Sequence, residues 1–245
     1  VTSPHQNIVT SPHHHIVTSP HHHIVTSPHQ NIVTSPHKNY HIMAYRNFKL
    51  IDLQQEFGLK IEQKKMPDKS QAKFIMPSDW LIETVRRSRY MIINNYKNLW
   101  AYLLLPILSE VKINNRKHVS FYYNETMNVD LHEKLKGKVD FIFVQTSAVI
   151  KMQIPLLYVI AAKKKETLEA LIPQIAAQMI GAYLLNKEHK QELRIVYGAV
   201  ILADAWVFLR LKENVLLIDT DVYHLDNLPA ILGVFQCLLK PQPWY

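Results

Sequence analysis

The sequence has one cysteine, few glycines and no long apolar run. Cys237 stands alone, so no intramolecular disulfide can form, and we expect a cytoplasmic protein. Five glycines among 245 residues exclude a collagen-like chain. The longest apolar candidate, residues 99–108, contains Pro106 and is far shorter than the ~20 residues that a membrane helix needs, so we expect no membrane partner. No basic segment followed by an apolar one opens the sequence, and we therefore expect no secretory signal.

Acidic residues are absent from the first part of the chain. Residues 1–42 contain one lysine, ten of the 14 histidines and no aspartate or glutamate. Residues 1–40 are five copies of an eight-residue unit such as VTSPHHHI, whose period fits neither a heptad nor a solenoid. Each unit has too few apolar side chains to offset the entropy of ordering a packed core. The sequence therefore predicts a disordered N-terminal repeat.

Two interpretations of this repeat stay open. Its histidine triplets, at residues 13–15 and 21–23, could bind a transition metal. Alternatively the repeat is translated DNA without a function, because any DNA repeat whose unit is a multiple of three nucleotides produces such a period. We favour the second interpretation and expect the folded part of the chain to begin at Met43.

The remaining chain has an ordinary globular composition with a moderate basic excess. Apolar residues make up 48% and charged residues 20% of the whole sequence, which excludes a wholly disordered chain. Residues 43–245 hold 27 of the 28 lysines and arginines and all 20 acidic residues, a net charge of 27 − 20 = +7. We expect a single domain over this range. Its charge permits a DNA partner without requiring one.

Apolar periodicity predicts an α/β (α+β) fold. Ser78 and Asp79 begin a predicted helix, because serine caps a helix N-terminus and aspartate suits the first turn. Residues 60–73 are polar, and we expect a loop there. Further helices are expected at residues 97–111 (broken near Pro106), 165–185 and 227–239, and strands at residues 119–123, 139–144, 156–163, 196–203, 205–212 and 214–219. This order indicates a mixed central β-sheet flanked by helices.

Polar side chains stand at defined places in these predicted strands. Asp140 follows Gly137 near the start of one strand, and Lys163 ends the next one. Side chains alternate along a strand, so residues 161 and 163 project to the same face. The following helix carries Gln178 within Ala-Gln-Met. The next two strands read Tyr-Gly-Ala-Val and Ala-Trp-Val-Phe.

In these residues the chain resembles the PD-(D/E)XK nuclease superfamily. The restriction-endonuclease-like core of that superfamily carries G-x-x-D on one strand, V-E-A-K on the next, a helix with A-Q-M, and then Y-G-x-V and x-W-x-F. The resemblance is strongest over residues 137–212. The chain from Met43 onward also resembles uncharacterised cyanobacterial proteins of this type.

The resemblance implies metal-dependent hydrolysis of DNA phosphodiesters. In such sites two carboxylates hold Mg²⁺ or Mn²⁺, and the metal polarises the phosphate and activates water. The lysine positions that water or neutralises the developing charge. Carried onto this sequence, the resemblance assigns catalytic roles to Asp140, Lys163 and Gln178, and a metal-binding role to Asp140.

The chain departs from the family pattern at one position. Ala161 stands where the second carboxylate belongs. Either that carboxylate has moved to the start of the following helix, where Glu166 is the first candidate metal ligand and Glu169 the second, or the site is inactive. We favour an inactive or impaired enzyme. The alternatives to a nuclease are a non-catalytic module that binds nucleic acid or protein, and a decaying gene product.

Other conspicuous side chains have plainer interpretations. We expect Tyr197 and Trp206 in the core, and Asp204, Asp219 and Asp221 at turns. A solvated helix face is the favoured interpretation of the basic residues Arg86, Arg87, Arg89 and Lys97. The histidines beyond the repeat share no metal-ligand spacing. The sequence predicts no oligomeric state.

Overall fold

The computed structural model describes residues 43–91, 96–129, 135–146, 152, 154–163, 166–191 and 193–240. The chain divides into two units, residues 1–39 and residues 40–245, and every described residue lies in the second. The predicted N-terminal repeat and its histidine triplets lie outside the described residues.

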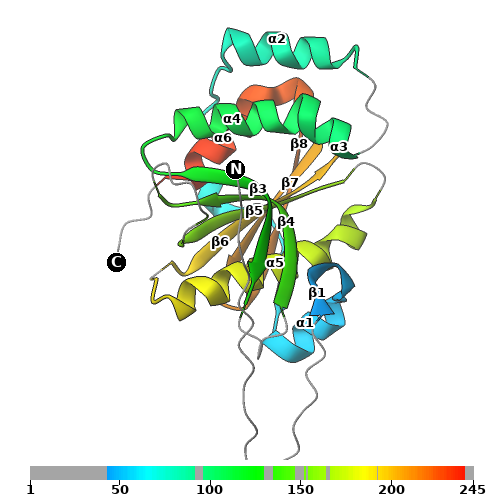
Figure 1. Cartoon of the computed structure of the whole chain (residues 1–245), viewed down its shortest axis with the longest axis vertical. Coiled ribbons are helices and arrows are strands. Elements are labelled where there is room, and N and C mark those ends of the chain that lie inside the picture. The colour runs from blue at the N-terminus through cyan, green and yellow to red at the C-terminus, as the bar shows by residue number, and fades with distance from the viewer. Residues whose placement is uncertain are drawn as a thin grey trace, which may run out of the picture. The chain divides into compact units, whose positions relative to one another are not determined.

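Within the described residues, eight strands form one mixed sheet, which confirms the predicted α/β fold (Figure 1). The strands are β1 (Met43–Ala44), β2 (Lys60–Gln63), β3 (Ser120–Asn128), β4 (Leu135–Val144), β5 (Leu156–Lys163), β6 (Ile195–Leu202), β7 (Ala205–Lys212) and β8 (Val215–His224). Their order is β1-β4-β5-β6-β7-β8-β2, and β3 pairs along the other edge of β4. The pairs β5–β6, β1–β4 and β2–β8 are parallel, and the others are antiparallel.

Helices cover both faces of this sheet. They are α1 (Leu50–Phe57), α2 (Asp79–Ser88), α3 (Tyr96–Leu99), α4 (Leu105–Asn114), α5 (Leu168–Glu188) and α6 (Leu228–Leu238). Figure 1 shows α5 on one face and α4 with α6 on the other. Alternate residues of each central strand point to these two layers: Phe141 and Phe143 join the core under α4 and α6, whereas Ile142 and Val144 join the core under α5.

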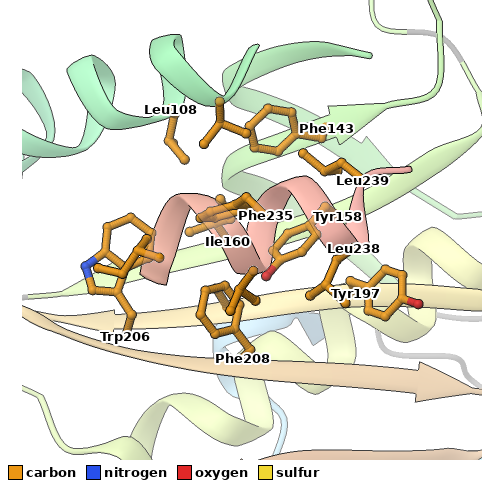
Figure 2. Close-up of a cluster of buried hydrophobic side chains, with 14 of the residues drawn as sticks. Leu108, Phe143, Tyr158, Ile160, Tyr197, Trp206, Phe208, Phe235, Leu238 and Leu239 are labelled. Atoms are coloured by element: carbon orange, nitrogen blue, oxygen red, sulfur yellow. The ribbon is translucent and has the colours of Figure 1, made fainter. Parts of the chain in front are cut away.

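The core under α6 is aromatic. Phe235 of α6 lies 5.2 Å from Tyr158, 5.5 Å from Phe208, 5.9 Å from Trp206 and 6.1 Å from Phe143, measured between ring centroids (Figure 2). These rings come from three strands, β4, β5 and β7. A single side chain of α6 therefore packs against three strands of the sheet. Their burial confirms that Trp206 is a core residue, as is Tyr197.

The long helix α5 is packed against the sheet. Of the described helices it is the one with the length and apolar composition to cross a membrane. It buries eleven residues, among them Gln178, against β4, β5 and β6. This burial is that of the core helix of a globular domain. Pro173 does not break it, because the proline removes only the hydrogen bond to the carbonyl of Glu169 in the exposed first turn.

Several predicted elements were confirmed and others were wrong. The strands β5 and β7 have the predicted bounds, and the predicted break near Pro106 is present, because a π-helical turn, Trp100–Leu104, precedes α4. The predicted loop over residues 60–73 was wrong, since β2 lies there and pairs with β8. The short helix α1 was not predicted, although Leu50, Leu53 and Phe57 lie at helical spacing; Leu53 is its one buried residue.

Candidate functional site

Strands β4 and β5, which carry Asp140 and Lys163, separate beyond Phe141 and Ile160; the opening between them beside Asp140 is here called the fork. Backbone pairing between β4 and β5 runs from Val144 to Phe141, opposite Ile160, and stops there. On the other edge of β4 the ladder with β3 skips Asn124, which lies opposite Asp140 and has a left-handed φ of 54°. Asparagine tolerates this conformation better than most residues. The sheet is therefore interrupted on both sides of Asp140.

The Asp140 side chain fills the opening towards β5. Its Oδ2 atom accepts a hydrogen bond from the backbone N–H of Ala162 at 3.1 Å and lies 3.5 Å from Nζ of Lys163. Both side chains are largely buried, with 14% and 23% of their surfaces exposed. Burial raises the pKa of Asp140, and the Lys163 charge and the Ala162 N–H oppose that rise. The structure thus brings the two predicted residues together as an ion pair.

Gln178 reaches the same edge of β4 from α5. It is fully buried, and its Nε2 atom donates a hydrogen bond to the carbonyl of Lys138 at 3.2 Å. This carbonyl lies between the stretch of β4 that pairs with β1 and the stretch that pairs with β5. Gln178 therefore satisfies a backbone group that neither neighbouring strand reaches. Its Oε1 atom has no hydrogen-bond partner among the described residues.

The position of the missing carboxylate is buried. Ala161 is fully inaccessible and belongs to the core under α5, on the same face of β5 as Lys163. Glu166 is exposed and precedes Thr167, whose hydroxyl caps α5 by accepting from Ala170 N–H, and Glu169 is exposed in the first turn. With the other described residues Glu166 forms neither a hydrogen bond nor an ion pair.

These donors do not fit a magnesium ion. Mg²⁺ requires several oxygen ligands in an octahedral arrangement. The fork supplies one carboxylate, and its Oδ2 atom already faces an ammonium group and a backbone N–H. In the described part of the chain no three aspartate, glutamate, histidine or cysteine side chains gather closely enough to share a metal ion. The side chains at the fork are therefore too few to hold Mg²⁺.

A second polar cluster was not predicted. Asp219 and Asp221 lie within β8, so the prediction that they belong to turns was wrong, whereas Asp204 does lie in the β6–β7 turn. Lys69 is buried, and its Nζ atom lies 2.5 Å from Asp219 Oδ2, 2.6 Å from Asp221 Oδ2 and 2.7 Å from Tyr223 Oη. Alternation along the segment Asp-Thr-Asp could have shown that both carboxylates share a face. No local pattern could have supplied the partner from so far along the chain.

The basic residues of α2 are partly neutralised. Glu83 pairs with Arg86 at 2.7 Å and with Arg87 at 2.6 Å, and these guanidinium groups lower the pKa of its carboxyl to about 2. All three side chains are well exposed, as expected for a solvated helix face.

The chain matches no protein-family model and no curated protein. The PD-(D/E)XK resemblance accordingly rests on the residues described above and stays a prediction.

Proposed function

We propose that residues 43–245 form a PD-(D/E)XK nuclease-like domain that binds DNA and whose catalytic site is impaired. The arrangement of the predicted site residues supports the ancestry. Asp140 and Lys163 come from adjacent strands and form an ion pair, and Gln178 reaches the same fork from the helix that follows. An aspartate in an apolar strand needs a reason to be there, because burying a carboxylate is costly.

The environment of Asp140 carries the proposed impairment. Lys163 and the Ala162 N–H engage one of the two Asp140 oxygen atoms, and the position where a second carboxylate belongs offers only the methyl group of Ala161. Without a second carboxylate, the lysine is the strongest partner that Asp140 has. The pair then holds the fork together, and its two charges largely cancel.

DNA affinity in this proposal comes from the surface charge and not from the fork. The domain has a net charge of 27 − 20 = +7 by sequence. Lysines and arginines that neutralise phosphates release counterions, so the affinity must fall steeply as salt is added. A cytoplasmic location, inferred from the single cysteine, is compatible with a DNA partner.

The proposal is tested with the full chain on plasmid DNA in the presence of Mg²⁺ or Mn²⁺. We expect neither the parent protein nor Asp140→Ala to cut, and we expect metal-free, salt-sensitive binding to a labelled duplex. If the parent cuts and Asp140→Ala does not, the impairment is refuted and Glu166 becomes the first candidate for a displaced ligand. Absence of duplex binding at low salt would refute the DNA-binding function and favour a protein-interaction module.

A further inference from the structure

A cavity lies beside the Lys69 cluster, away from the fork. Residues 65–75, here called the strap, cross the C-terminal half of β8 and meet α6. Between them is an open cavity of about 600 Å³. Its lining includes Lys65, Lys69, Lys73, Phe74, Asp221 and Tyr223.

The cavity and the fork are separate sites. Tyr223 lies in a row of paired residues with Trp206, Ile201 and Ala162, on four successive strands. Three strand spacings of about 4.8 Å place Tyr223 about 14 Å from Ala162, whose N–H Asp140 binds. A ligand in the cavity would therefore not contact Asp140 or Lys163.

The floor of the cavity is a preformed polar surface. The Lys69 ammonium donates hydrogen bonds to Asp221 and Tyr223 and forms an ion pair with the buried Asp219. Because the Tyr223 hydroxyl accepts from Lys69, its own proton is left to donate. Lys65 and Lys69 both meet Oδ2 of Asp221, so its Oδ1 atom is an acceptor that other described side chains leave open. The floor thus offers one donor and one acceptor side by side.

The rim of the cavity combines positive charge with an exposed ring. Lys65 has 76% of its side chain exposed, Lys73 is exposed, and Phe74 is 73% exposed. The three lysines of the lining face Asp221 and the buried Asp219, which leaves a net charge of 3 − 2 = +1. The charge favours an anionic ligand, and the ring favours one with a flat apolar group.

The wall that carries the rim is fixed in place. Ile75 N–H donates to the carbonyl of Pro229 at 3.1 Å. A Cβ atom at Gly233 would collide with the carbonyl of Lys73, so α6 and the strap touch here through their backbones. Anchoring of the strap accounts for the buried Lys69. It does not account for an exposed Phe74 beside an open, lysine-rimmed cavity.

We propose that this cavity binds a nucleotide. The base lies against Phe74 with its polar edge on Asp221 and Tyr223, and the phosphate lies between Lys65 and Lys73. The volume is within the range of about 300–1,000 Å³ that small-molecule sites occupy. The nucleotide is either free or the terminal nucleotide of a strand, because both present the same base and 5′-phosphate.

Calorimetric titration of the full chain tests this site with AMP, with a 5′-phosphorylated dinucleotide and with inorganic phosphate. We expect both nucleotides to bind and inorganic phosphate to bind at least about tenfold more weakly, since it lacks the base. Phe74→Ala should weaken AMP binding by at least about fivefold, the lower end of what stacking of a base on an aromatic ring contributes. Lys73→Glu should weaken it further.

Lys212→Glu is the matched control, because it makes the same charge change at the opposite end of β7 from Trp206. It should leave AMP binding unchanged. Tighter binding of AMP than of the dinucleotide assigns the site to free nucleotides, and the reverse order assigns it to strand ends. The inference is overturned if neither nucleotide binds the parent, or if Phe74→Ala and Lys73→Glu bind AMP as the parent does. Both side chains are exposed, so folding of the variants is not at risk.

Discussion

The carboxylate of Asp140 takes the place of a backbone carbonyl for Ala162. Where the ladder between β4 and β5 stops, the N–H of Ala162 donates to Asp140 Oδ2 at 3.1 Å. The same oxygen faces Lys163 at 3.5 Å. A side chain that is catalytic in the resembled family here completes the hydrogen bonding of a sheet.

The charge of Asp140 is expected to lower stability at neutral pH. Burial raises the pKa of Asp140 above its ordinary value of 3.8, so the folded protein holds this proton more tightly than the unfolded chain does. The resulting stabilisation is fully present below pH 3.8 and is lost as the pH rises through the folded-state pKa. Urea titrations at several pH values should show the free energy of unfolding of the parent falling relative to that of Asp140→Asn as the pH rises. The exposed Asp226→Asn is the control. The assignment is contradicted if the free energy of unfolding of the parent minus that of Asp140→Asn stays constant or increases as the pH rises.

The buried lysine of the strap should matter far more than the exposed one beside it. Lys69→Met leaves Asp219 buried without its cation, which we expect to cost about 3–5 kcal/mol in the free energy of unfolding. Lys65→Met removes an exposed contact to Asp221 at 3.4 Å and should cost less than about 1 kcal/mol. Urea denaturation of both variants compares the two costs, and similar values would mean that the cluster does not anchor the strap.

The backbone contact between α6 and the strap should not tolerate a methyl group. In Gly233→Ala the new Cβ meets the carbonyl of Lys73, so the strap or the helix must move, at a cost of about 1–3 kcal/mol. In Gly198→Ala the nearest atom is the sulfur of Met179 at 2.6 Å, the flexible end of a side chain that can turn away. Thermal denaturation should rank Gly233→Ala as the less stable variant. The reverse ranking would show that the strap can move away from α6 at little cost in stability.

The amide of Gln178 should not be replaceable by a carboxylate at neutral pH. Gln178→Glu places a buried carboxylate against the carbonyl of Lys138, in place of an N–H that now donates at 3.2 Å. We expect a loss of at least about 3 kcal/mol at pH 7, because leaving a buried polar group unpaired costs about 1–3 kcal/mol and a charged one more. Part of the loss should return on acidification, since a protonated carboxyl can donate. Gln174→Glu, half-buried on the same helix, is the control, and equal losses in the two variants would contradict the role given to Gln178.

The sequence predicts the centre of this fold better than its periphery. The bounds of β5 and β7 could be predicted because continuous apolar runs end at a proline, a charge or a turn. The strand β2 could not, because Lys-Ile-Glu-Gln is a short edge strand with mostly exposed side chains and shows no alternation of apolar residues. The strand β8 extends past its apolar run into Asp-Thr-Asp, which as a sequence reads like a turn.

Of the two polar clusters, only the one at Asp140 could be predicted from the sequence. The meeting of Asp140 and Lys163 follows from adjacent strands and the alternation of side chains, which are local properties. The meeting of Lys69 with Asp219 joins the strap to β8, two segments that lie far apart in the sequence. Only the three-dimensional structure shows that the opening beside Asp140 is closed by Ala162 N–H.

Restoring the missing carboxylate tests the central claim most directly. Ala161→Glu, the double variant Asp140→Ala with Ala161→Glu, and the parent are compared for nicking of supercoiled plasmid in Mg²⁺ and Mn²⁺. Circular dichroism verifies that each variant is folded. The account predicts metal-dependent cutting by Ala161→Glu alone, because two carboxylates beside Lys163 complete the donor set. A folded Ala161→Glu protein that binds DNA and does not cut would contradict the claim that one substitution disarms this site.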